Sequence, residues 1–291
     1  MRIAGKSAPA TMWRAFFMAA CLPAGLHAGA APASPPDLAQ IGRLDAAETA
    51  ALVQQFRRAG IAGEFFLRLQ LIAMPRKSAE RTYDGRLWGG RNDQGTVFRL
   101  ELTDGAGATH RLLIQNGERP AVWKWNGGAA VQLEIGAWFE PLLPGLEITA
   151  FDLQMPFLYW PAPAFDKIVR MLGRPTHAVV FRPPPGFAAP APGIGAVRAY
   201  LDTQYNALFQ TEIIDGAGAV AKTFSFLALK RIGDQHVPKQ ADYRNERTRD
   251  KTRLQVTGAA LNLRLPAGLF ESAGLARDAT PPADGVVRID P

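Results

Sequence analysis

Cysteine and histidine are both scarce in this sequence of 291 residues. The single cysteine, Cys21, cannot form a disulfide framework, and it excludes zinc sites built from several cysteines. Three of the four histidines, His110, His177 and His236, lie beyond the N-terminal region, each in or beside a strand pattern. None has a second metal ligand two or four positions further along the chain. We therefore expect no metal site and no cofactor.

The sequence also lacks the short motifs that mark common catalytic sites. It contains neither the G-x-S-x-G turn of many hydrolases nor the H-E-x-x-H helix of zinc peptidases. The glycine pairs at 193/195 and 216/218 lack the third glycine of a nucleotide-binding loop, and we interpret them as turns. The sequence favours a protein that is not an enzyme. A hydrolase whose site is assembled from distant residues is an alternative.

The N-terminus has the plan of a secretory signal peptide over residues 1–30. Basic residues precede the short apolar run 15–22, small residues follow it, and no acidic residue occurs. We expect cleavage after Ala30, with Ala28 as the competing site, and a flexible leader over 31–40. The four residues ending at Cys21 also resemble a lipobox, in which Cys21 would be acylated and become the first residue.

The predicted cleavage lowers the net positive charge of the chain. The whole chain has 33 basic and 26 acidic residues, a formal net charge of +7, and removal of residues 1–30 takes away three basic residues and no acidic one. The remaining excess is mild, and nucleic acid is not an expected partner of an exported chain. No later run of eighteen apolar residues predicts a transmembrane segment. We expect a periplasmic protein, with anchoring through Cys21 as the alternative.

Residues 45–58 have the pattern of a helix. Asp45 can cap the first turn together with Glu48 three residues later, and Arg57 and Arg58 occupy the end that favours positive charge.

After Gly63 the hydrophobic period becomes that of a strand. Turns are predicted at Asn126–Gly127 and Asp215–Gly216. The order predicts a mainly β fold, a long antiparallel meander in one domain over 41–270, with a loosely ordered tail over 271–291. The strand patterns are 65–72, 96–103, 110–115, 120–125, 130–135, 177–181, 196–202, 207–214, 220–229, 237–243 and 253–256.

Two connections depart from the meander. Residues 151–161 are too apolar for a surface loop and contain two prolines, which predicts a short helix or an irregular segment. This segment is either a lid over a ligand or a plug of the core between strands. The loop 183–195, rich in proline, alanine and glycine, either gates the pocket or merely connects strands.

Basic residues occupy every second position from 247 to 253. On a strand, Arg247, Arg249, Lys251 and Arg253 would project from one face. Such a face is either a solvated strand that avoids edge pairing or a docking surface for an anionic partner.

Taken together, these features resemble the outer-membrane lipoprotein-sorting proteins, the LolA-like periplasmic carriers. The resemblance covers about residues 40–270. It rests on the export signal, the N-terminal helix, and a strand that begins at Gly63-Glu64-Phe65. Further along the chain it rests on Asp152-Leu153, Phe157-Leu158-Tyr159-Trp160-Pro161, Gly173-Arg174-Pro175, Val197-Arg198-Ala199-Tyr200-Leu201-Asp202, Tyr205-Asn206-Ala207-Leu208, Asp215-Gly216 and Val220-Ala221-Lys222-Thr223-Phe224.

This resemblance implies an incomplete antiparallel β-barrel, a curved sheet whose concave apolar face is covered by the N-terminal helix and a short helical lid. It implies a carrier or chaperone that binds acyl chains of a lipoprotein or lipid and moves them from an inner-membrane donor to an outer-membrane acceptor. Apolar residues on both faces of several strands (Phe65 and Phe66, for example) agree with a sheet covered on both sides. The arginine contacts by which such carriers hold the lid cannot be identified in the sequence.

Twelve apolar residues are candidates for the ligand pocket: Phe65, Leu67, Leu69, Phe98, Leu100, Trp123, Trp125, Leu153, Phe157, Trp160, Phe224 and Phe226. The alternative to a carrier is a non-enzymatic envelope protein, acylated at Cys21 in one version, that docks a membrane transporter or another envelope partner.

Overall fold

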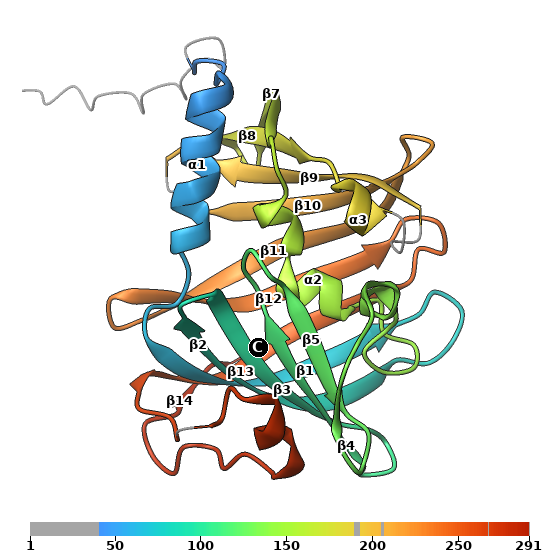
Figure 1. The fold of residues 1–291 in the computed structure, drawn as a ribbon, viewed down its shortest axis with the longest axis vertical. Coiled ribbons are helices and arrows are strands. Elements are labelled where there is room, and N and C mark those ends of the chain that lie inside the picture. Colours follow the sequence, from blue (N-terminus) through green and yellow to red (C-terminus); the bar gives the residue numbers. More distant parts are fainter. Residues whose placement is uncertain (1–40, 189–192, 205–206, 267, 291) are drawn as a thin grey trace, which may run out of the picture. The chain divides into compact units, whose positions relative to one another are not determined.

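The computed structural model describes residues 41–188, 193–204, 207–266 and 268–290, and fourteen strands of these residues form one antiparallel sheet (Figure 1). The predicted signal peptide, Cys21 and the leader lie outside the described residues. In chain order the strands are β1 (Glu64–Met74), β2 (Arg81–Asn92), β3 (Gly95–Thr103), β4 (Thr109–Gln115), β5 (Ala121–Trp125), β6 (Ala130–Gln132), β7 (Ala164–Met171), β8 (Arg174–Phe181), β9 (Ile194–Asp202), β10 (Leu208–Asp215), β11 (Val220–Ile232), β12 (Gln235–Asn245), β13 (Lys251–Leu263) and β14 (Val287–Arg288).

The sheet consists of two meanders that meet at a single pairing. Strands β1 to β6 follow one another outward in one direction, and β7 to β13 return from the far edge until β13 pairs with β1. Strands β6 and β7 are the two edges of this path, so the curved sheet does not close. The predicted incomplete antiparallel barrel is therefore confirmed.

The sequence pattern does not predict β2 and β7. Strand β2 contains Gly85 and Gly89, which interrupt the hydrophobic alternation. A Cβ atom at position 89 would lie 2.1 Å from Cζ of Phe65, and one at position 85 would lie 2.4 Å from Cδ1 of Leu69. The glycines are thus places where side chains of β1 cross the neighbouring strand, a feature that a single-strand pattern cannot reveal.

The N-terminal helix α1 (Ala46–Arg58) is confirmed with its predicted cap. The Asp45 carboxylate accepts a hydrogen bond from the Glu48 amide at 2.8 Å, and the Asp45 amide donates to the Glu48 carboxylate at 2.9 Å. The buried Val53 and the partly buried Phe56 join the main core of the sheet. None of the helices in the described part of the chain is long and apolar enough to span a membrane.

The connection from β6 to β7 runs from one edge of the sheet to the other. This crossing segment, residues 133–163, contains the 3-10 turns η2 (Ile135–Phe139) and η3 (Pro156–Tyr159) and the helix α2 (Ala150–Gln154). A further short helix, α3 (Pro185–Ala188), follows β8. Side chains of α1, α2, η3 and α3 belong to one large apolar cluster with Phe65, Leu67 and other strand residues, and we call that side of the sheet the inner face.

The outer face of β1 to β5 is covered by the C-terminal residues 264–290, which we call the C-terminal strap. Phe66 and Trp88 are fully buried there against Leu269, while Val97 and Leu113 pack on Leu275 of η4 (Ser272–Ala276). This differs from the loosely ordered tail expected for 271–291. The prediction failed because the strap is mostly polar and rich in proline, and its few buried apolar residues contact strands that lie far away in the sequence.

A buried ion pair fastens the strap to β3. The side chains of Arg99 and Glu101 are 2% and 1% exposed, and Arg99 donates to Glu101 at 2.8 Å. Arg99 also donates to the carbonyls of Gly274 (2.8 Å) and Arg277, while the Ala279 amide donates to Glu101 at 3.0 Å. Because these buried charges also satisfy backbone groups of the strap, the strap is specified by polar as well as apolar contacts.

Candidate functional site

The centre of the inner face is filled by aromatic rings from the crossing segment and from α3. We call Phe151, Phe157, Trp160 and Phe187 the aromatic plug, and all four are buried. The ring centroids of Trp160 and Phe187 are 4.9 Å apart, and those of Phe151 and Phe187 are 6.0 Å apart. Phe157 meets Phe181 of β8 at 5.5 Å, so the plug packs directly on the sheet.

Local sequence explains why the plug is irregular. Thr149 and Asp152 form a capping box that starts α2, and Met155 then adopts a left-handed conformation with φ of 49°. Pro156 follows, and because its ring cannot continue the preceding helix the chain turns into η3 instead. The predicted short helix or irregular segment is confirmed. It turns Phe157, Leu158 and Trp160 inward, whereas Leu153 is only partly buried.

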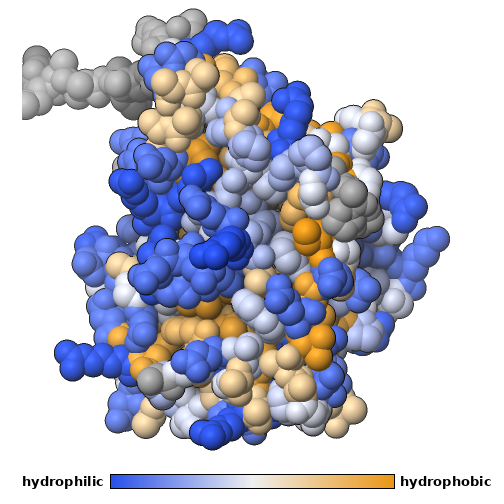
Figure 2. Space-filling model, in the orientation of Figure 1, coloured by the Kyte–Doolittle hydropathy of each residue, from blue (hydrophilic) through white to orange (hydrophobic). Residues whose placement is uncertain are grey.

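A groove of about 600 Å³ opens beside the plug. Its walls come from the end of β6, from η2, from η3 and from α3. Figure 2 shows hydrophobic side chains at the surface near α2 and further hydrophobic patches lower on the same face. We call this opening the aromatic groove, and its large apolar lining residues are Leu133, Ile135, Trp138, Tyr159, Trp160 and Phe187.

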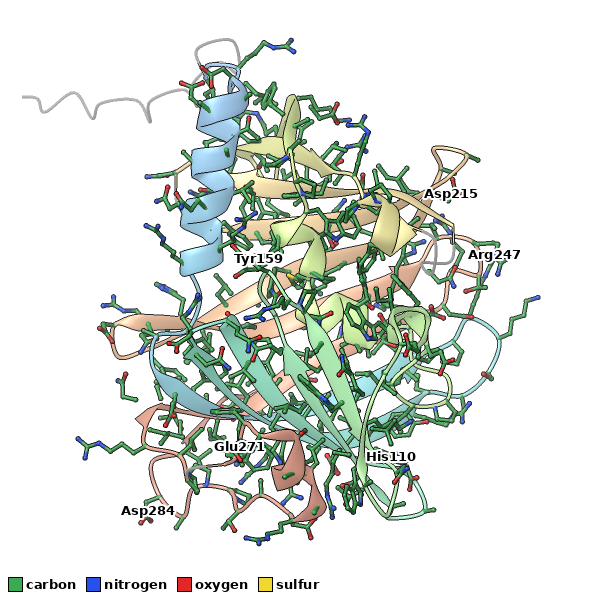
Figure 3. All side chains as sticks on the ribbon, viewed as in Figure 1. His110, Tyr159, Asp215, Arg247, Glu271 and Asp284 are labelled. Atoms are coloured by element: carbon green, nitrogen blue, oxygen red, sulfur yellow. The ribbon has the colours of Figure 1, made fainter. Side chains whose placement is uncertain are left out.

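Arg57 links α1 to the crossing segment. Its Nε donates to the carbonyl of Leu158 at 2.7 Å, and its guanidinium lies 4.7 Å from the ring centroid of Tyr159. Tyr159 lies near the lower end of α1 in Figure 3. Sequence reasoning assigned Arg57 only to the helix terminus, because a contact across 101 positions of the chain leaves no local signal.

The other end of α2 is anchored by a buried ion pair. Asp152 accepts hydrogen bonds from the amide of Thr149 at 2.8 Å and from Nζ of Lys222 on β11. The side-chain Nδ2 of Asn245 donates to the Glu147 carboxylate at 3.2 Å. Glu147, Thr149, Lys222 and Asn245 line a second groove of about 820 Å³. Asp215 and Arg247, which also line it, lie at the same side of the sheet in Figure 3.

Burial perturbs two titratable groups of this region, Glu147 in the second groove and Tyr243 in the core of the inner face. Burial raises the pKa of the Glu147 carboxyl, although Asn245 and Lys222 favour its charged form. Burial, helped by the charge of Asp152, raises the pKa of Tyr243 well above its usual value.

Ten of the twelve predicted pocket residues lie together on the inner face. Seven are buried members of its cluster, and Phe98, Leu153 and Phe226 pack against it. Trp123 and Trp125 lie on the outer face instead, near Leu113 and Leu275. On β5 it is the intervening Val122 that faces inward. Because both faces of this part of the sheet are covered, hydrophobicity did not reveal which face is the inner one.

The predicted basic strand face is wrong in its first half. Residues 246–248 form a turn, Arg249 has a φ of 68°, and β13 begins at Lys251. Arg249 pairs with Glu246 at 2.7 Å, and both Lys251 and Arg253 pair with Asp242 at 3.0 and 2.8 Å. The turn signal was hidden by the alternation of basic residues, and three of the four charges are paired within the chain.

Among the described residues, no group of three or more histidine, cysteine, aspartate or glutamate side chains is placed to hold a metal ion. His110 and Asp104 form a surface pair at 2.8 Å, and the His177 ring is mostly buried. What the inner face can do chemically is bury apolar surface.

Comparison with known proteins gives a likeness in fold. No protein-family model matches the sequence, and no curated protein matches it. Among solved structures, an outer membrane lipoprotein-sorting protein domain from Vibrio parahaemolyticus has a TM-score of 0.69 at 16% identity, over 80% of this chain and 100% of that one. A DUF1329 family protein from Desulfovibrio piger has a TM-score of 0.68 at 10% identity, over 79% and 98%.

A LolA superfamily protein from Nitrosomonas europaea is also similar, with a TM-score of 0.60 at 11% identity, over 76% of this chain and 96% of that one. These identities establish a shared fold rather than a shared activity. The LolA-like resemblance predicted from the sequence is thus confirmed at the level of architecture: the chain has the half-barrel fold of the LolA superfamily and of lipoprotein-sorting domains.

Proposed function

We propose that this protein is a carrier that binds acyl chains of a lipoprotein or a lipid on the inner face of its half-barrel. The observation that carries the proposal is the aromatic plug. An open sheet holds its largest apolar surface against an irregular segment of short turns, and the aromatic groove leads to that segment. The likeness in fold to a lipoprotein-sorting domain supports the same function.

The energetics of such binding are favourable. Burial of each methylene group contributes about 0.8 kcal/mol, so a chain of twelve or more carbons offers on the order of 10 kcal/mol before the costs of binding. The plug already fills the inner face, so the crossing segment must shift when an acyl chain enters, and Trp160 and Phe187 then pack on the acyl chain instead of on each other. The crossing segment suits this displacement because its helical elements span only four or five residues each.

In this proposal the contact of Arg57 with Leu158 stabilises the closed state, in which the plug occupies the inner face. The chain acts in the periplasm after removal of residues 1–30. It takes cargo from a donor in the inner membrane and delivers it to an acceptor in the outer membrane. The binding is not enzymatic and needs no cofactor.

Native mass spectrometry of the protein purified from its own periplasm, followed by solvent extraction, tests the proposal. We expect a stoichiometric adduct with the composition of acyl chains. The same spectrum gives the mature N-terminus, and a diacylglyceryl group on Cys21 would contradict a freely shuttling carrier.

A titration with a fluorescent fatty acid locates the site. Trp160→Ala is expected to weaken binding about tenfold or more, because it removes a ring from both the plug and the aromatic groove. Trp123→Ala, which truncates a tryptophan of the outer face, is the matched control and should leave affinity unchanged. Equal affinity of the wild type and Trp160→Ala would contradict the assignment of the site.

A further inference from the structure

The β11–β12 hairpin carries exposed hydrophobic side chains. Leu227 is 46% exposed and Leu229 is 53% exposed, and they are two of the five large hydrophobic residues that are exposed in the described part of the chain. We call residues 226–241, from the middle of β11 to the middle of β12, the hairpin arm. Two leucines so close together on one strand are a local apolar patch rather than scattered surface residues.

The geometry of the hairpin arm turns these leucines outward. The register between β11 and β12 shifts on both sides of Ala228, which leaves Leu227 as an extra residue on one strand and Lys239 as an extra residue on the other. Such bulges bend a strand and redirect side chains. The inner face of the arm already supplies Val237, fully buried, and Ile232 to the core. The fold therefore does not need Leu227 and Leu229 for its own packing.

The hairpin arm also extends beyond its neighbouring strands. In the described residues, the pairing of β10 with β11 reaches Gln210 and Ser225, and the pairing of β12 with β13 reaches Gln240 and Gln255. Among the described residues, the strand pairing of residues 226–239 is within the hairpin, and near its tip the Gln235 side chain accepts from the Ala62 amide and donates to Asn262. The arm is thus a two-stranded ribbon, accessible along its outer side.

Positive charge surrounds the two leucines. Lys230 and Arg231 are exposed, Lys239 is half-buried, and the sole acidic residue of the arm up to position 241 is Asp234 at the turn. Among the described residues, none of these three basic side chains has a carboxylate within ion-pair distance. Arg253 and Arg198 on the same half of the sheet contrast with them, since each is paired with carboxylates.

We propose that the hairpin arm docks on a membrane surface that contains anionic phospholipids. Phospholipid headgroups supply the negative charge that Lys230, Arg231 and Lys239 lack within the chain, and the boundary below them accepts the two leucine side chains. Basic residues around exposed leucines match a membrane interface because long side chains reach the phosphates while the apolar ones insert. This proposal does not depend on the identity of the cargo or on the aromatic plug.

Vesicle co-sedimentation of the mature protein tests the docking site. The wild type is expected to sediment with vesicles of phosphatidylglycerol and phosphatidylcholine, to bind pure phosphatidylcholine vesicles at least tenfold more weakly, and to be released by salt. The double variant Lys230→Glu/Arg231→Glu should bind the anionic vesicles with an affinity about 20-fold lower than that of the wild type. Leu227→Ser/Leu229→Ser should lose about tenfold while it keeps part of the salt dependence.

Matched controls separate the hairpin arm from the rest of the surface. Lys124→Glu/Lys167→Glu makes the same change in net charge at exposed positions of β5 and β7, and Leu172→Ser removes a leucine that is 78% exposed. Both should bind anionic vesicles as the wild type does. The proposal is overturned if these controls lose as much binding as the arm variants, if the arm variants bind normally, or if the wild type does not distinguish the two vesicles.

Two further measurements keep this result distinct from the proposed carrier function. Thermal unfolding of the arm variants should match the wild type, because the substituted side chains lie outside the core. The arm variants should bind the fluorescent fatty acid normally, and Trp160→Ala should still sediment with anionic vesicles. Loss of vesicle binding in Trp160→Ala would overturn docking through the arm and attribute sedimentation to the acyl-binding site.

Discussion

The two halves of the sheet differ in how their outer faces are stabilised. Strands β1 to β5 bury both faces, with the aromatic plug on one side and the C-terminal strap on the other. Strands β8 to β12 bury the inner face, whereas their outer face carries ion pairs such as Arg198 with Asp166 and Glu212, and Asp242 with Arg253. The first half therefore depends on contacts distant in sequence, and the second on polar pairs between adjacent strands.

The largest difference is expected for arginine substitutions in the two halves. Arg99→Ala should lower the free energy of unfolding by about 3 kcal/mol, because it leaves two strap carbonyls and part of Glu101 unsatisfied in a buried place. Arg198→Ala, at a side chain that is 22% exposed, should cost about 1 kcal/mol or less. Urea unfolding measures both. Equal losses of unfolding free energy in the two variants would contradict the proposed difference between the two outer faces.

A smaller effect is expected where β1 crosses β2. Gly89→Ala should cost about 1–3 kcal/mol, since its Cβ would overlap the Phe65 ring on the inner face. Gly105→Ala is the control, because no atom lies within 4 Å of its Cβ position and its φ is not positive. Thermal unfolding of the two variants provides the comparison, and a neutral Gly89→Ala would show that the Phe65 ring moves aside freely.

The smallest effect concerns the polar outer face and depends on pH. Burial alone would raise the pKa of Asp242, but hydrogen bonds from Arg253 and Lys251 outweigh it and hold this pKa below its usual value. The stabilisation is therefore complete above the unfolded pKa, about 4, and is lost as the pH falls through the folded pKa. Asp242→Asn should cost about 1 kcal/mol at pH 7 and progressively less toward pH 2.

Urea unfolding at a series of pH values checks this prediction. Asp290→Asn is the control, because the pair of Asp290 with Arg288 is more than four-fifths exposed and should contribute little at any pH. A cost of Asp242→Asn that stays constant down to pH 2 would contradict a role for the carboxylate charge.

Several elements could be predicted because their signals are local. The cap of α1 lies within four residues, and the turns at Asn126 and Asp215 lie between strands of clear alternation. Strand β2 was not predicted because its glycines make room for side chains of the neighbouring strand β1. The strap was not predicted because its apolar residues, such as Leu269 and Leu275, pack on residues more than 150 positions earlier in the chain.

The candidate site was predicted to a similar extent. Ten of the predicted pocket residues share one cluster because strand alternation groups them, and Phe157 and Trp160 stood out as aromatic residues in an irregular segment. Trp123 and Trp125 were assigned to the pocket because the sequence gives no sign of which covered face is inner. Phe187, Trp138 and Arg57 were missed, since their roles arise only when α3 and α1 pack against the crossing segment that contains η2.

The sequence by itself determined the secondary structure class, the meander order and the presence of an apolar segment that interrupts it, because these depend on periodicity, caps and turns within a few residues. Tertiary structure decided which face became the inner one, where the sheet stayed open, and that the C-terminal strap closes the outer face of the first half. Those outcomes depend on contacts between distant residues such as Arg99 and Gly274, whose free energy appears only once the chain has folded.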